Sequence, residues 1–97
     1  MLKHVVIWKV KDPARKAEHA AQVKAQLESL AGRIPGLLRI EVGIDIGYDA
    51  DAHDVVLYSE FTDRAALDAY QPHPLHLEVK KVIGPLLTAR HAVDWES

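Results

Sequence analysis

The 97-residue sequence contains no cysteine, which excludes disulfide bonds, thiolate metal sites and a cysteine nucleophile. It has no long hydrophobic run. The apolar stretch near the start, MLKHVVIWKV, lacks the features of a signal peptide, and no stretch approaches the length of a membrane span. There is also no excess of positive charge, since 12 Lys and Arg against 14 Asp and Glu give a net charge of −2. Nucleic acid and membrane are therefore not expected as partners, and a cytoplasmic protein is expected.

The composition that remains is that of an ordinary folded domain. Hydrophobic residues make up 48% and charged residues 27% of the chain, which argues against disorder. We interpret residues 1–97 as one domain, because a chain of this length has no room for a second core. A domain this small buries only about 60–65% of its unfolded surface, so it is a candidate for stabilisation by self-association.

Residues 2–10, LKHVVIWKV, are rich in β-branched and aromatic side chains and predict the first strand. Both faces of this strand carry large apolar groups, so we expect both to be covered. One face holds His4, Val6, Trp8 and Val10, and the other holds Val5 and Ile7.

Residues 14–31 are predicted to form the first helix. Asp12 is suited to cap it and Pro13 to occupy its first turn. Gly32 is expected to end the helix, and residues 34–37, IPGL, form the turn out of it. An apolar stripe at spacings of three and four runs along the helix: Ala17, Ala20, Val23, Leu27 and Leu30.

The second half of the chain shows three more strand signals and two helix signals. The predicted strands are 37–47, 54–61 and 87–96, and the predicted helices are 63–70 and 74–84. Pro72 and Pro74 separate the two helices. In strand 37–47 the apolar residues alternate with polar or small ones: Leu38, Ile40, Val42, Ile44 and Ile46. Strand 54–61 should place Val55, Leu57 and Phe61 on one face and Val56 and Tyr58 on the other.

The order β-α-β-β-α-β predicts an α+β, ferredoxin-like fold with an antiparallel sheet and both helices on one face. This arrangement leaves the other face of the sheet bare. Because the first strand is apolar on both sides, we expect a second copy of the chain to cover that face. Two sheets packed in this way form a dimeric α+β barrel, so a homodimer is predicted.

Two further motifs stand near the ends of this pattern. Residues 3–12 are KHVVIWKVKD, and residues 70–76, YQPHPLH, place two histidines and a tyrosine around two prolines before a last strand that ends in VDWE. Together with the IPGL turn, these motifs resemble the stress-responsive A/B barrel (Dabb) family over essentially the whole chain. The resemblance also implies a dimeric α+β barrel.

The family includes a plant polyketide cyclase that closes a linear poly-β-ketone by intramolecular aldol condensation without cofactor or metal. The resemblance implies that its working tyrosine and histidine correspond to Tyr70 and His76, that its first-strand histidine corresponds to His4, and that His73 matches the first histidine of the turn. Where the cyclase has a histidine on its third strand, this chain has Val55.

The chemistry of these residue types agrees with such a role. His76 falls in the first turn of a predicted helix, where the helix dipole lowers the pKa of an imidazole, and a neutral imidazole is a good base for a proton next to a carbonyl. Tyr70 could donate a hydrogen bond to the resulting enolate oxygen. A pocket lined by Val6, Trp8 and Leu57 would suit a small apolar or aromatic carbonyl ligand.

Plainer interpretations stand beside this hypothesis. His76 and Tyr70 could simply brace the turn, and His73 could lock it by bonding the backbone. His73, His76 and His4 could in principle share a metal ion. His53 reads as peripheral, and His91 as a packing or interface residue. The protein could then be a non-catalytic homodimeric stress-response protein, or, as the last-ranked alternative, a cofactor-free monooxygenase on the same barrel.

Overall fold

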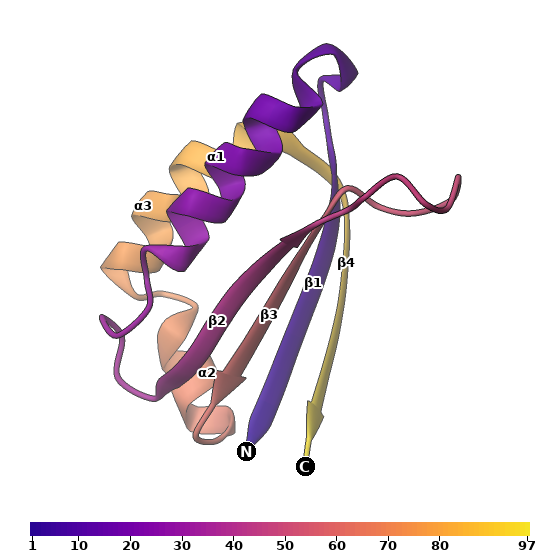
Figure 1. Cartoon of the computed structure of the whole chain (residues 1–97). Helices are drawn as coiled ribbons and strands as arrows, with labels where there is room; N and C mark the ends of the chain where they lie inside the picture. The colour runs from indigo at the N-terminus through magenta and orange to yellow at the C-terminus, as the bar shows by residue number, and fades with distance from the viewer.

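The chain forms one sheet with its helices on one face, as shown by a computed structural model that describes residues Met1 to Ser97 (Figure 1). The strands lie in the order β2-β3-β1-β4, and every neighbouring pair is antiparallel. The predicted ferredoxin-like α+β fold is confirmed. The elements are β1 Leu2–Val10, α1 Lys16–Glu28, β2 Leu37–Ile44, β3 Val55–Phe61, α2 Arg64–Tyr70, α3 Pro74–Ile83 and β4 Leu87–Glu96, with 3₁₀ turns at Pro13–Arg15 and Gly84–Leu86.

The hydrophobic core lies between the sheet and the helices. It contains 18 buried hydrophobic residues, with Phe61 and Val23 fully enclosed. The alternation predicted for β3 is confirmed, since Val55, Leu57 and Phe61 are buried on one face together with Ser59, while Val56 and Tyr58 on the other face are only partly buried. None of the helices has the length and apolar character needed to cross a membrane.

The opposite face of the sheet has no helix over it, as Figure 1 shows. Cross-strand pairing places Val5 of β1 between Tyr58 of β3 and Val93 of β4 on this side. We call this surface the open face; its apolar members are Val5, Ile7, Val56, Val93 and Trp95. The side chains of Val93 and Trp95 are 64% and 42% exposed in the single chain.

The first helix is shorter than the sequence predicts. Asp12 does cap its start, because its carboxylate accepts a hydrogen bond from the Ala14 N–H at 3.0 Å, but it caps a 3₁₀ turn over Pro13–Arg15. At the other end the chain leaves the α-helix after Glu28 and continues in turns to Gly32, whose φ of 73° is left-handed. The helix thus loses residues at both ends to tighter turns, a common form of helix terminus.

The predicted alternation along the second strand is wrong at Leu38. Leu37 pairs with Phe61 and Arg39 pairs with Glu60, so Leu38 is an extra residue in the strand and is exposed. Such a β-bulge reverses the alternation, because two residues then oppose one on the partner strand. The strand also ends at Ile44, which leaves Ile46 in the exposed loop.

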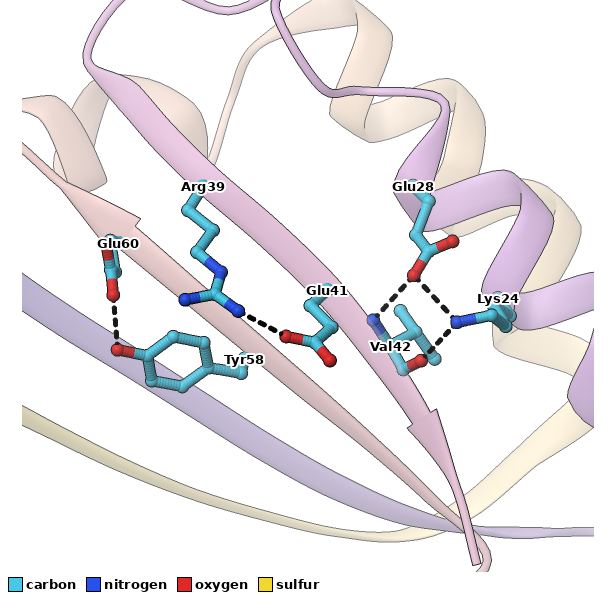
Figure 2. Close-up of polar contacts among 7 residues, drawn as sticks. All are labelled: Lys24, Glu28, Arg39, Glu41, Val42, Tyr58 and Glu60. Carbon is cyan, nitrogen blue, oxygen red and sulfur yellow. Dashed lines mark hydrogen bonds and ion pairs between the residues drawn. The ribbon is translucent and has the colours of Figure 1, made fainter.

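Side chains of α1 close the outer edge of β2, as shown in Figure 2. The backbone N–H of Val42 donates to Glu28 Oε2 at 3.0 Å, and Lys24 Nζ donates to the Val42 carbonyl at 2.6 Å. Lys24 and Glu28 also pair with each other at 2.9 Å. Because unpaired backbone groups on an edge strand can recruit another strand, this contact protects the sheet from pairing at β2.

Glu28→Ala is expected to reduce the free energy of unfolding by about 1 kcal/mol, since the Val42 N–H loses its acceptor. The hydrogen bond from Lys24 and that from Val42 lower the pKa of Glu28, so its stabilisation is complete above the unfolded value of about 4.3 and is lost as pH falls through the folded value. The difference from wild type in urea titrations should therefore vanish in acid. Glu78→Ala breaks only an exposed pair with Lys81 and should cost less than about 0.5 kcal/mol. Equal losses in the two variants would contradict the edge role.

Candidate functional site

A cavity of about 390 Å³ lies between the sheet and the C-terminal half of the chain. Its walls come from β1, α1, β3, the turn between α2 and α3, the length of α3 and the start of β4. The predicted site residues that line it are His4, Val6, Trp8, Leu57, Tyr70 and His76. His73 is the one predicted site residue that does not.

Tyr70 and His76 form the centre of this site. Tyr70 is the last residue of α2, and α3 begins at Pro74, so the tight turn between them brings the two rings together. The rings stack with centroids 4.0 Å apart and an interplanar angle of 21°. The pairing expected from the YQPHPLH motif is therefore present in the fold.

His76 is buried, and the bonds of its ring define its tautomer. Nδ1 lies 3.1 Å from the Gln71 carbonyl and 3.2 Å from the Tyr70 carbonyl. Since carbonyls only accept, Nδ1 carries the proton, and Nε2 of the neutral ring retains its lone pair with no partner in the chain. Burial lowers the pKa of His76 below its usual 6.5 and outweighs the bond to Gln71, which raises it. The predicted direction is right, although burial rather than the helix dipole is the main cause.

The Tyr70 hydroxyl is a buried donor without an acceptor. The side chain is only 1% exposed, and Oη makes no hydrogen bond. Burial raises the pKa of Tyr70 to about 12, so the hydroxyl stays protonated at neutral pH. An unpaired buried hydroxyl costs roughly 1–3 kcal/mol, which a ligand oxygen in the cavity would recover.

Asp94 is a site residue that the sequence reasoning missed. It pairs across the strands with His4, and its Oδ1 bonds His4 Nδ1. His4 is buried and lines the cavity, so Asp94 fixes the orientation of its ring. The VDWE motif contained this residue, but nothing in the motif indicated its partner.

The remaining histidines lie outside this arrangement. His73 Nδ1 accepts a hydrogen bond from the Leu75 N–H at 3.1 Å and caps α3, which agrees with a structural role and turns its ring to the backbone. The metal site considered for His73, His76 and His4 does not form, because no group of three such side chains converges. His53 and His91 contact each other edge to face at 5.4 Å, away from the cavity.

None of the curated proteins matches this chain. A dimeric protein of unknown function with a ferredoxin-like fold from Bacteroides fragilis NCTC 9343 is 28% identical, with a TM-score of 0.85 over 99% of this chain and 95% of that chain. A dimeric ferredoxin-like protein of unknown function from Thermobifida fusca YX is also 28% identical, with a TM-score of 0.85 over 97% and 88% of the two chains.

More distant structures share the fold alone. A protein described as an antibiotic biosynthesis monooxygenase is 19% identical, with a TM-score of 0.77 over 100% of this chain and 98% of that chain. Residues 2–97 match the family described as the Stress responsive A/B Barrel Domain, Dabb. This match covers nearly the whole chain and agrees with the motifs at both ends, so the protein belongs to the Dabb family.

Proposed function

We propose that the protein binds a small β-carbonyl compound of polyketide-like character in this cavity and removes a proton from the carbon next to a carbonyl. The observation that carries the proposal is the stacked pair of His76 and Tyr70. One ring offers an unprotonated Nε2, and the other offers an unpaired hydroxyl, at the wall of one cavity. A base and an oxyanion donor side by side are what enolate formation needs.

The reaction needs no reactant other than the ligand itself, because the proton that His76 removes is returned at the end. His76 Nε2 takes the α-proton, and the C–H electron pair moves into the enolate, whose oxygen accepts a hydrogen bond from Tyr70. The enolate carbon can then attack a second carbonyl of the same molecule, which forms a C–C bond and an alkoxide. The imidazolium of His76 returns its proton to that alkoxide, which completes an aldol cyclisation. His4, whose Nδ1–H is directed to Asp94, presents Nε2 to the cavity as an acceptor that can hold an enol hydroxyl of the same ligand.

Tyr70→Phe is expected to keep the fold and to slow enolate formation by about a hundredfold, since it removes only the oxyanion donor. Stability should be unchanged or higher, because the buried hydroxyl has no partner to lose. The rate is measured as hydrogen–deuterium exchange at the α-carbon of ethyl benzoylacetate by NMR. Tyr48→Phe is the matched control, since Tyr48 is 90% exposed in the hairpin loop. A Tyr70→Phe variant with wild-type exchange would remove this tyrosine from the mechanism.

We also propose that the protein is a homodimer formed through its open face. Structures similar to this chain are described as dimeric. The open face carries contiguous apolar side chains around Val5, and toward its β2 side a polar rim follows. In this rim the Tyr58 hydroxyl donates to Glu60 at 2.5 Å and Arg39 pairs with Glu41 at 2.8 Å (Figure 2). An apolar centre with a polar rim is the usual composition of a protein interface.

The second candidate is a non-catalytic homodimeric stress-response protein. The observation that favours it is that both turn histidines bond the backbone, His73 as the cap of α3 and His76 through its Nδ1. The two candidates differ in the exchange assay. A wild-type protein that leaves the exchange rate at its buffer value across a series of β-keto esters would support the non-catalytic role.

A further inference from the structure

The charges in the cavity wall all have one sign. Among the residues that line it, Lys80 and Arg90 are the only ones that carry a full charge at neutral pH, and no acidic side chain is among them. Neither forms a salt bridge within the chain, whereas the neighbouring Lys81 pairs with Glu78 at 3.2 Å. The cavity therefore has two free cations beside an otherwise largely apolar wall.

Lys80 stands on the same side of α3 as His76. Residues four apart on a helix are neighbours on its surface, so Lys80 follows His76 one turn along the cavity wall. The two are close enough to interact electrostatically, since Lys80 contributes to lowering the pKa of His76. A negative group bound at Lys80 would thus lie near the proposed base.

Arg90 reaches the cavity because of an irregularity in β4. Ile7 pairs with His91 and Lys9 pairs with Thr88, so Trp8 alone opposes two residues, Ala89 and Arg90. Both of these line the cavity together with Trp8. Bulges of this kind redirect side chains and are frequent beside active sites.

The bulge holds Ala89 in a conformation that an alanine seldom adopts. Its φ of 54° lies in the left-handed region, where it is the one non-glycine residue of the chain. A non-glycine residue in this region is strained and persists only where the surrounding structure imposes the conformation. The strained residue, Ala89, is therefore the direct neighbour of Arg90, the residue that the bulge brings to the cavity wall.

We propose that Lys80 and Arg90 form an anion subsite, so that the natural ligand is a carbonyl compound bearing a carboxylate. The inference rests on the proposed function, because it concerns the same ligand: the anionic group would be at the end away from the reacting carbonyl. The apolar part lies against Val6, Trp8 and Leu57, with the reacting carbonyl at Tyr70 and His76. Arginine suits this task because its guanidinium can bind both oxygens of a carboxylate.

The test uses two stable probes of the same shape, 3-benzoylpropionate and its neutral methyl ester, titrated against the full chain by calorimetry. The carboxylate should bind about tenfold or more tightly than the ester, because a charge-assisted hydrogen bond contributes on that scale. Lys80→Gln and Arg90→Gln should each reduce this ratio several-fold, and the double variant should bring it close to one. The affinity for the ester should stay constant throughout, which shows that the variants remain folded.

Lys81→Gln is the matched control, because it removes an exposed lysine one residue along the same helix, and it should leave the ratio unchanged. Equal binding of acid and ester by wild type would overturn the anion subsite and leave the proposed function intact. If neither probe binds, the small-molecule site itself is wrong and the inference falls with it. A third probe, phenyl phosphate, is compared with phenylacetate, and tighter binding of the phosphate would overturn the choice of a carboxylate.

Discussion

Replacing His76 by asparagine is expected to slow α-proton exchange by about 10²–10⁴-fold, the usual contribution of a general base, while the fold is retained. The structure explains why this variant separates the two roles of the ring. Nδ1 braces the turn through the Gln71 and Tyr70 carbonyls, and Nε2 is free. The asparagine amide nitrogen occupies the place of Nδ1 and can donate to the same carbonyls, but nothing then occupies the place of Nε2. Exchange is followed by NMR with ethyl benzoylacetate.

His76→Ala is the comparison that makes this result informative. It removes the brace as well as the base and should destabilise the protein by about 1–3 kcal/mol. Denaturation must be measured at one protein concentration, because the stability of a dimer depends on it. An asparagine variant that exchanges as fast as wild type would show that His76 only braces the turn.

The pH dependence of the exchange rate provides a second check on the same base. Burial lowers the pKa of His76 below 6.5, and burial raises the pKa of Tyr70 to about 12. The base is active when unprotonated and the donor when protonated. The rate of enzymatic exchange should therefore rise with pH through the pKa of His76 and stay level from neutral pH to the alkaline end of the protein's stable range.

The positions of the strands could be predicted from the sequence wherever neighbouring residues alone determine them. The first and last strands occupy residues 2–10 and 87–96 as predicted, because both are runs of strand-forming residues between clear turn signals. The predicted cavity residues converge because strand alternation and the proline turn are both local features. His73 does not line the cavity because its ring caps α3. Whether a histidine caps a helix depends on its side-chain rotamer, which cannot be predicted from the spacing of residues in the sequence.

The contact between His4 and Asp94 could not be predicted in the same way. Leu87, an odd-numbered residue, is buried on the helix side, so strict alternation would put Asp94 on the open face. The extra residue in the bulge at Ala89 reverses this alternation and moves Asp94 to the side of His4. A left-handed position is usually marked by glycine, and an alanine there gives no signal in the sequence.

Replacing Val93 by aspartate is expected to weaken the proposed homodimer by about a thousandfold while the protomer stays folded. The side chain is 64% exposed in the single chain, so the carboxylate remains hydrated in the monomer. In a face-to-face pair it would be buried beside Val5 in the apolar centre of the open face, and burying a charge there costs about 4 kcal/mol or more. Sedimentation equilibrium over a range of protein concentrations measures the change.

Leu77→Asp is the matched control, because Leu77 is 42% exposed on α3, a helix on the other side of the sheet. This variant should remain as dimeric as wild type. Val93→Asp with wild-type association would show that the open face is not the interface. The cavity is lined by residues of one chain between the sheet and the helices. Dimerisation would cover the open face, on the other side of the sheet from the cavity, so each protomer would hold a complete site of its own. A monomeric Val93→Asp protein should therefore bind 3-benzoylpropionate as wild type does.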